Sequence, residues 1–321
     1  MTDQPPFQPV KLNAPAHWAH HLLYDTGRYV LDGYFYGTGT LVITFENAQG
    51  DFSETDLFRH GWGAKLFRAQ KVSHIAVKPK AGDWYQAPCL SPALAKLRAA
   101  GLFDQFDNIV TYGTSMGGFA AIAFADQVQA TTVLALSPQT TLNRDLVPWE
   151  KRFPVARKQT WMGDNNDAVG KSLHAKRVLC VYDMHHPLDR AHVARLDQSN
   201  LHHINTPFQG HGIAIPLVKL KAAKPLLAYA LGETEDLTPF YAALRGRKAQ
   251  ERYFKQIAGK DRVKTSDAFT KIIKRERKKA GFNAAASKAK TAEGSKYLMA
   301  QATGPGGLRK IIRHLRRRIV G

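Results

Sequence analysis

A Gly-Thr-Ser-Met-Gly pentad at residues 113–117 constrains the fold more than any other feature of this sequence. A short β-prone run, 108–112, precedes the pentad, and a run of small and apolar residues, 119–124, follows it. The glycines suit a tight turn because they remove side chains that would crowd it. The G-x-S-x-G pattern therefore predicts a strand, a sharp turn and a helix, with the Ser115 hydroxyl beside the helix N-terminus. Such a position suits a nucleophile.

The body of the chain alternates strand-like and helix-like patterns, which is the signature of an α/β sheet flanked by helices. Strand-like runs fall at 28–37, 40–46, 72–77, 108–112, 131–136, 177–182 and 201–205, and helix-like runs at 62–69, 91–100, 190–196 and 213–223. Residues 138–172 lack the hydrophobic periodicity of a helix or a strand, so we expect a lid or insertion there, or a surface excursion. The predicted organisation is an N-terminal arm (1–27), an α/β domain (28–238) and a C-terminal extension (239–321).

The positive charge of the chain is concentrated in that extension. The net charge is +20, and 23 of the 46 Lys and Arg residues but only 5 of the 26 Asp and Glu residues follow residue 239. A near-neutral body therefore carries a basic, helical C-terminal extension. Three interpretations of 240–321 stay open: binding to an anionic polymer, contact with an anionic membrane through the amphipathic segment 308–320, or a solvated extension without a particular partner. No specific nucleic-acid motif is visible.

The two cysteines and the N-terminal residues indicate in which cellular compartment the protein is expected. Cys89 and Cys180 lie far apart and form no metal-ligand pattern, which fits a reducing compartment. The first residues do not resemble a signal peptide, and no apolar run approaches the ~18 residues of a transmembrane helix. We therefore expect a cytoplasmic protein, with a peripheral location at the inner membrane surface as a further hypothesis.

A nucleophilic serine needs a base that takes its proton and an acidic group that orients the base. His211 is the candidate base, because it lies between two glycines in a loop after the last strand-like run. Asp183 and Asp189 are the candidate acids, and Asp183 is preferred because Asp189 suits a helix N-cap. The pair His185 and His186 lies in the same loop without further ligands, so we expect no metal site.

Together, the strands, the serine turn, the acid loop and the Gly-His-Gly loop resemble the α/β-hydrolase superfamily over roughly residues 28–232. The resemblance implies a Ser115 nucleophile, a His211 base and an oxyanion hole, with no cofactor. One oxyanion donor would be the N–H of Met116, and the other would come from the loop at 45–50, where Glu46 and Asn47 are the candidates. Many members carry His-Gly in that loop, whereas this chain has Phe-Glu.

The resemblance implies a serine esterase or thioesterase with a small-molecule or acylated substrate, such as an acylated glycan or lipid. Two alternatives stay open. One is a non-catalytic α/β-hydrolase-like protein that uses its basic extension on an anionic polymer or membrane. The other is an acyltransferase, since the same residues could pass an acyl group to an alcohol in place of water.

Overall fold

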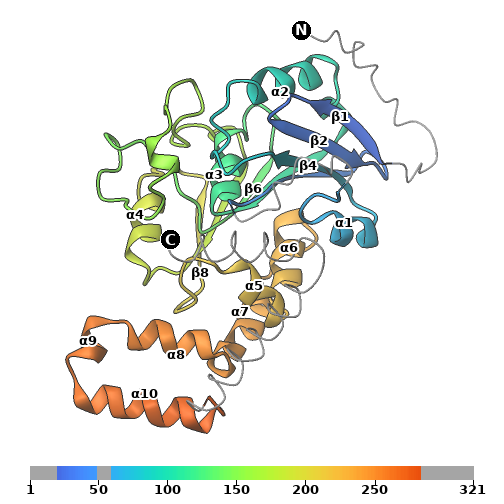
Figure 1. The fold of residues 1–321 in the computed structure, drawn as a ribbon. Coiled ribbons are helices and arrows are strands. Elements are labelled where there is room, and N and C mark those ends of the chain that lie inside the picture. The colour runs from blue at the N-terminus through green and yellow to red at the C-terminus, as the bar shows by residue number, and fades with distance from the viewer. Residues whose placement is uncertain (1–19, 49–58, 283–321) are drawn as a thin grey trace, which may run out of the picture. The chain divides into compact units, whose positions relative to one another are not determined.

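The computed structural model describes residues 20–48 and 59–282 (Figure 1). The chain divides into two compact units, Met1–Arg247 and Lys248–Gly321. The composition change had suggested a boundary at residue 238. The first unit extends beyond it because helix α7 (Thr238–Leu244) buries Phe240 and Leu244 in that unit's core.

The first unit is built on an eight-stranded sheet with the order β1-β2-β4-β3-β5-β6-β7-β8. Strand β2 runs antiparallel to its two neighbours, and all other neighbouring pairs are parallel. This mostly parallel sheet confirms the predicted α/β-hydrolase-like fold class. The strands are β1 (His21–Asp25), β2 (Tyr29–Tyr34), β3 (Thr40–Phe45), β4 (Ser73–Pro79), β5 (Asn108–Thr114), β6 (Thr132–Leu136), β7 (Arg177–Tyr182) and β8 (Leu201–Asn205).

Strand β1 lies within the segment 1–27, which the sequence analysis set apart as an arm. It pairs with β2 through His21 opposite Gly33 and Asp25 opposite Val30. The strand is an edge strand of five residues with only one buried side chain, so its sequence lacks the apolar run that marks the inner strands.

Helices cover both faces of the sheet. The first face carries α2 (Leu90–Ala99), α3 (Met116–Ala123) and α4 (Pro187–Val193), and the second carries α1 (Ala64–Gln70), α5 (Ala214–Lys219), α6 (Ala223–Leu231) and α7. Each inner strand feeds both cores, because successive side chains point to opposite faces. In β3, Ile43 and Phe45 pack under α3, whereas Val42 packs on the other side with Phe67 of α1.

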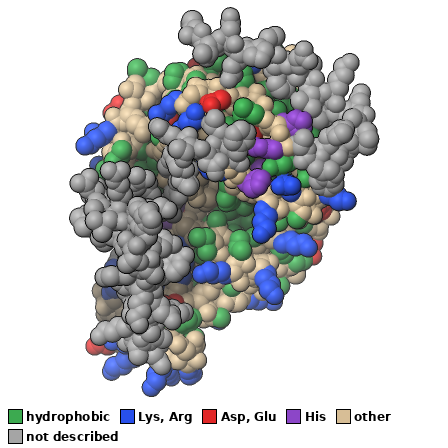
Figure 2. All heavy atoms as spheres, turned by 45° about the vertical axis from the view of Figure 1, so that its right-hand side comes forward, with side chains coloured by type: hydrophobic (Ala, Val, Ile, Leu, Met, Phe, Trp, Pro, Cys, Tyr) green, Lys and Arg blue, Asp and Glu red, His purple; other side chains and the backbone are tan. Residues whose placement is uncertain are grey.

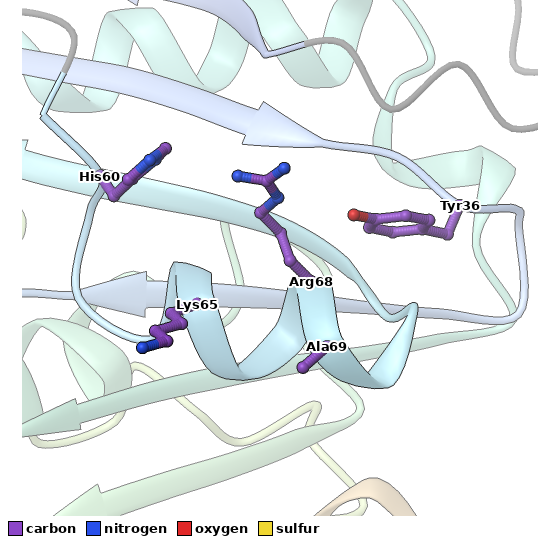
Figure 3. A pocket seen from close by; sticks show the side chains of 5 residues that line it. All are labelled: Tyr36, His60, Lys65, Arg68 and Ala69. Carbon is purple, nitrogen blue, oxygen red and sulfur yellow. The ribbon is translucent and has the colours of Figure 1, made fainter.

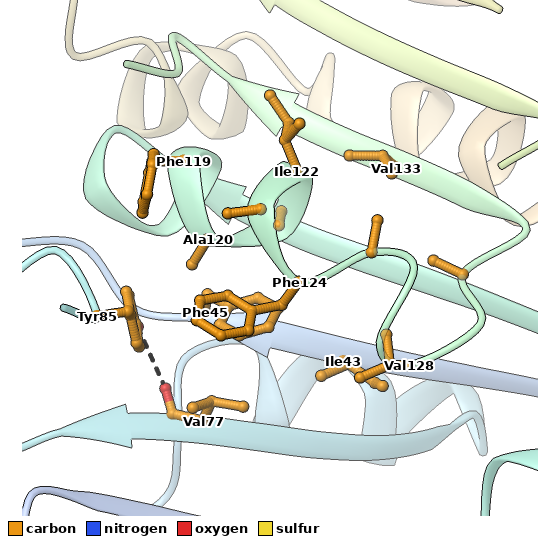
Figure 4. Packing of buried hydrophobic residues seen from close by; sticks show 14 of the residues in the cluster. Ile43, Phe45, Val77, Tyr85, Phe119, Ala120, Ile122, Phe124, Val128 and Val133 are labelled. Carbon is orange, nitrogen blue, oxygen red and sulfur yellow. Dashed lines mark hydrogen bonds between the residues drawn. The ribbon is translucent and has the colours of Figure 1, made fainter. Parts of the chain in front are cut away.

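The core under α3 is the larger of the two. Figure 4 shows Phe119 and Ile122 of α3 packed over the sheet, with Phe45, Phe124 and Tyr85 meeting beside them. The Phe45 and Phe124 rings stack with centroids 5.9 Å apart. Full burial of each such side chain stabilises the fold by about 1.5–3 kcal/mol, which fixes α3 and the serine turn that precedes it.

The long connection between β6 and β7 has little regular secondary structure. The stretch between β6 and β7 contains only the short 3₁₀ helix η2 (Ala156–Lys158), and a second one, η1 (Phe103–Gln105), precedes β5. Leu142, Val147 and Trp161 are nevertheless buried, so the stretch 138–172 is packed against the domain.

The second unit is a small helical hairpin. It comprises α8 (Glu251–Ala258), α9 (Asp261–Lys264) and α10 (Asp267–Lys279), while η3 (Arg245–Ala249) spans the boundary. The Arg277 side chain donates to Glu251 at 2.6 Å and links α10 to α8. No helix among the described residues is long and apolar enough to cross a membrane. The predicted amphipathic segment 308–320 lies outside the described residues.

Candidate active site

The serine of the pentad sits on a strained turn between β5 and α3. Ser115 has φ 55° and ψ −117°, a left-handed backbone that costs a non-glycine residue energy. Its N–H donates to the carbonyl of Leu136 at 2.8 Å, which ties the turn to β6. The helix begins at Met116, so the Ser115 side chain stands at the N-terminal end of α3. The strand–turn–helix predicted from the sequence is confirmed.

Two glycines make this turn sterically feasible. A Cβ atom on Gly113 would lie 2.1 Å from the carbonyl oxygen of Gly117. A Cβ atom on Gly117 would lie 2.1 Å from the carbonyl oxygen of Phe45, at the end of β3. Real Cβ atoms do not approach backbone so closely, so only glycine fits at either position. The turn and the loop after β3 are therefore packed backbone against backbone.

His211 reaches Ser115 from the loop that follows β8. Its Nε2 atom lies 2.9 Å from Ser115 Oγ. On the other side of the ring, Nδ1 lies 3.0 Å from both carboxylate oxygens of Asp189. Asp189 belongs to the first turn of α4 and is fully buried. The sequence prediction that Ser115 and His211 come together agrees with these distances.

The preference for Asp183 over Asp189 as the carboxylate beside His211 disagrees with the geometry. Asp183 Oδ2 accepts the N–H of Gly210 at 2.8 Å, and Oδ1 accepts the N–H of His185 at 3.0 Å. Asp183 thus ties the two loops together without facing the ring. Asp189 is also not the N-cap of α4: that position is held by His186, whose Nδ1 accepts the N–H of Asp189.

Behind Asp189 lies a buried ionic network that the sequence analysis missed. Arg152 Nη1 donates to Asp189 Oδ1 at 2.7 Å, and its Nη2 donates to Glu150 Oε2 at 2.6 Å. Glu150 Oε2 also lies 3.1 Å from Nε2 of His192 in α4. Glu150, Asp189 and His192 are fully buried. Arg152 and Glu150 lie in the stretch 138–172, so this stretch supplies the surroundings of the acid.

This network keeps two buried carboxylates ionised. Burial alone would raise the pKa of Asp189, but hydrogen bonds with His186 and His211 and the charge of Arg152 hold it well below its ordinary value. Burial would likewise raise the pKa of Glu150, but hydrogen bonds from His192 and Arg152 lower it to about 2. Asp189 is therefore held as a carboxylate at neutral pH, which suits a group that faces an imidazole.

Gln139 is a further residue beside Ser115 and His211, and it was not predicted from the sequence. Its Oε1 lies 3.3 Å from Ser115 Oγ, and its Nε2 lies 3.5 Å from His211 Nε2. The indole N–H of Trp84 donates to the same Gln139 oxygen at 3.3 Å and orients the amide. A signal was available, because Gln139 follows the carboxyl end of β6, and ligands of parallel sheets bind at that edge.

The oxyanion donors expected at Met116 and Asn47 remain predictions. Met116 opens α3 next to the serine, so its N–H belongs to the first helical turn, where backbone donors have no intrahelical partner. Asn47 lies in the loop after β3. In that loop the Glu46 carboxylate is engaged by Arg59, at 2.7 Å for both nitrogens, and by the Trp62 N–H at 3.1 Å.

Among residues 20–48 and 59–282, no group of three His, Cys, Asp or Glu side chains could hold a metal ion. The expectation of no cofactor remains a prediction.

No protein-family model and no curated protein matches the chain. Its fold is similar to a Pyrobaculum calidifontis esterase, at 13% identity and a TM-score of 0.48, over 69% of this chain and 87% of that chain. It is also similar to Est1E from Butyrivibrio proteoclasticus (16% identity, TM-score 0.42, 66% and 99% of the two chains). A third similar structure is the capsule O-acetyltransferase of Neisseria meningitidis serogroup A (13% identity, TM-score 0.43, 63% and 92% of the two chains). By its strand order and its serine turn, the first unit of this chain has the α/β-hydrolase fold.

Proposed function

We propose that this protein is a serine hydrolase that cleaves a carboxylic ester or thioester through an acyl-enzyme. One observation carries the proposal: Ser115 Oγ, His211 and the Asp189 carboxylate form a continuous chain of contacts at 2.9 and 3.0 Å. These three residues are called the triad below. A nucleophile, a base and an orienting acid in this arrangement support acyl-transfer chemistry.

The proposed mechanism begins with attack of Ser115 Oγ on the substrate carbonyl, while His211 Nε2 takes the hydroxyl proton. Asp189 stabilises the imidazolium that forms. The oxyanion develops next to the Met116 N–H, and one such donor contributes about 10²–10³-fold to the rate. His211 then gives its proton to the leaving alcohol or thiol. In the second half, water attacks the acyl-enzyme and loses a proton to His211. His211 then returns this proton to Ser115 Oγ as the bond between Oγ and the acyl group breaks, which releases the acid.

The test is labelling of the purified full-length protein with a fluorophosphonate, together with turnover of p-nitrophenyl acetate and of an acetyl thioester. We expect one site of labelling, at Ser115, and loss of both labelling and turnover in Ser115→Ala. Ser91→Ala, a change of a serine in α2, serves as the matched control and should keep both. A folded wild-type protein that resists the probe would refute the proposal.

Acyl transfer to an alcohol is a second candidate, and Gln139 favours it. The Gln139 amide lies 3.3 Å from Ser115 Oγ and 3.5 Å from His211 Nε2. Its oxygen and nitrogen atoms can hydrogen-bond to a further hydroxyl group of a polyol acceptor, which water does not have. If acetyl-enzyme formed from p-nitrophenyl acetate partitions to added glycerol in preference to water, and Gln139→Ala reverses this preference, the transferase is favoured over the hydrolase.

The basic extension 240–321 is proposed to bind an anionic polymer or membrane, and its charge is the support for this. Binding to heparin or to phosphatidylserine vesicles should then weaken steeply with salt and with replacement of Arg316, Arg317 and Arg318 by Gln. Binding that is absent at low salt would contradict it, and would leave the enzymatic proposal untouched.

A further inference from the structure

A basic pocket lies on the first unit away from the triad. Its volume is about 390 Å³, and it is lined by Tyr36, His60, Lys65, Arg68 and Ala69 (Figure 3). Three of these residues belong to α1, one precedes that helix, and Tyr36 follows β2. We call this the α1 pocket.

Strand register places the α1 pocket far from Ser115. Tyr34, at the end of β2, stands opposite His74, which is in register with Val42 and, through β3, with Val110 of β5. Val110 precedes Ser115 by five residues. At ~3.3 Å per residue, Tyr34 and Ser115 are therefore separated by roughly 16 Å along the strand direction. The α1 pocket is therefore a separate site, and it does not depend on the proposed function.

One tyrosine organises the polar groups of the α1 pocket. The Arg68 guanidinium lies over the Tyr34 ring, 4.6 Å from its centre. The Tyr34 hydroxyl lies 3.0 Å from Nδ1 of His60, and its ring stacks on His20 with centroids 5.0 Å apart. Tyr34 is itself buried. The arginine and the histidine are thus held in place before any ligand arrives, which lowers the entropic cost of binding.

In the described part of the chain, the cations of the α1 pocket have no carboxylate partner. Lys65 and Arg68 are three residues apart on α1 and share a face of the helix, where like charges repel. No Asp or Glu lines the pocket. Within residues 20–48 and 59–282, no ion pair joins either cation to a carboxylate, and the nearby Asp32 is instead bound by Lys78 and His20.

Figure 2 brings the side of the molecule that carries α1 forward, and histidine side chains gather there with Lys and Arg side chains. In the close view, the His60, Arg68 and Tyr36 side chains border the same space above α1 (Figure 3). Two cations and a histidine around one hollow form an electrostatic site for an anion.

We propose that the α1 pocket binds the phosphate group of a small phosphate monoester, with the organic part of the ligand against Tyr36 and Ala69. Arginine matches phosphate oxygens with two parallel N–H donors, and lysine adds a point charge. The Tyr36 ring and the Ala69 methyl group offer an apolar wall beside those donors. The volume falls in the ~300–1,000 Å³ range of small-molecule sites.

The test is calorimetric titration of the full-length protein with inorganic phosphate and with ribose 5-phosphate in 150 mM NaCl. We expect saturable binding of both, with ribose 5-phosphate tighter. Arg68→Gln should weaken both ligands about 10-fold or more, and Lys65→Ala about 3-fold to 10-fold, because hydrogen bonds between charged groups are lost. Tyr36→Ala should weaken ribose 5-phosphate alone.

Two control variants keep the result interpretable. Lys224→Ala removes an exposed charge elsewhere on the first unit and should bind like the wild type, which separates the α1 pocket from general attraction to a basic protein. Arg68→Lys keeps the charge but loses the paired donors, so it should bind with intermediate affinity. Thermal melting of each variant checks that it is folded.

Three outcomes would overturn the proposal. The first is the absence of saturable binding to the folded wild type at up to 10 mM ligand. The second is equal weakening by Lys224→Ala and Arg68→Gln. The third comes from vesicles that contain phosphatidic acid: if Arg68→Gln weakens binding to these but not to ribose 5-phosphate, the phosphate belongs to a lipid and not to a soluble molecule.

Discussion

Replacement of each candidate acid by asparagine, one at a time, provides the sharpest test of the triad. In Asp189→Asn, the group that faces His211 Nδ1 loses its charge and gains an N–H donor. If that amide donates to Nδ1, the ring carries its proton on Nε2 and can no longer accept the proton of Ser115. Asp183→Asn is the matched control, because this aspartate is also buried and lies in the loop that leads from β7 into α4.

The expected magnitude follows from the distances. Asp189 lies 3.0 Å from Nδ1, and a unit charge about 4 Å from the imidazolium contributes about 4 kcal/mol at an effective dielectric constant of about 20. At about 1.4 kcal/mol per factor of ten, this is about 10³-fold in kcat. The wrong tautomer lowers the rate further, to the ~10⁴-fold measured for the same change in serine proteases.

The control should behave differently. Asp183→Asn weakens the hydrogen bonds to Gly210 and His185, at about 1–3 kcal/mol for a buried group left without its partner. It leaves the contact between Asp189 and His211 in place, so we expect a loss of stability and at most a ~10-fold loss in kcat.

The assay is steady-state hydrolysis of a p-nitrophenyl ester, with active enzyme counted by fluorophosphonate titration and folding checked by circular dichroism. If Asp183→Asn lowered kcat more than Asp189→Asn in folded protein, the assignment of Asp189 would be refuted. Equal losses of only a few-fold would refute the role of either carboxylate.

Three further predictions follow from the same region. Replacement of Arg152 by Met should destabilise the fold by about 3–5 kcal/mol, because it leaves the buried carboxylates of Glu150 and Asp189 without their cation; unchanged thermal unfolding would contradict this. The pKa of Glu150 is lowered to about 2, so its contribution to stability is complete above pH 4.5 and is lost as pH falls toward 2. In urea denaturation, Glu150→Gln should therefore reduce the dependence of stability on pH in this window, whereas the exposed Glu233→Gln should match the wild type. Gly117→Ala should cost about 1–3 kcal/mol and most of the activity, since its Cβ must displace the Phe45 carbonyl; unchanged unfolding in guanidinium would argue against that clash.

Local patterns in the sequence were sufficient to predict most of the sheet and the serine turn. Inner strands such as β6 and β7 are nearly continuous apolar runs because both of their faces are buried. The G-x-S-x-G pentad is itself the signature of the strand–turn–helix that it forms. His211 could be predicted from its glycine neighbours and its place after the last strand. These signals all lie within a few residues of the feature that they predict.

The choice between Asp183 and Asp189 could not be made in this way. Both follow β7 within a few residues, and the direction of each side chain depends on how α4 is capped, by His186 in this fold. Arg152 and Gln139 were missed for a similar reason, because irregular backbone gives no periodicity from which to infer burial. The boundary predicted at residue 238 leaves Phe240 outside the α/β domain. The basic residues that follow α7 dominate the local composition, so the buried face of this helix is not evident from the sequence.

For the proposed hydrolase, the ionic contact between Arg152 and Asp189 has a consequence for the evolution of specificity. A surface loop that only covers a site can change length and sequence freely as substrates change. Here the stretch 138–172 also contacts the Asp189 carboxylate through Arg152, so under the proposed mechanism the residues around Arg152 could not change without loss of the reaction. Variation in substrate preference should then accumulate beyond Phe153, at exposed positions such as Val155 and Met162, while the turn that carries Glu150 and Arg152 stays fixed.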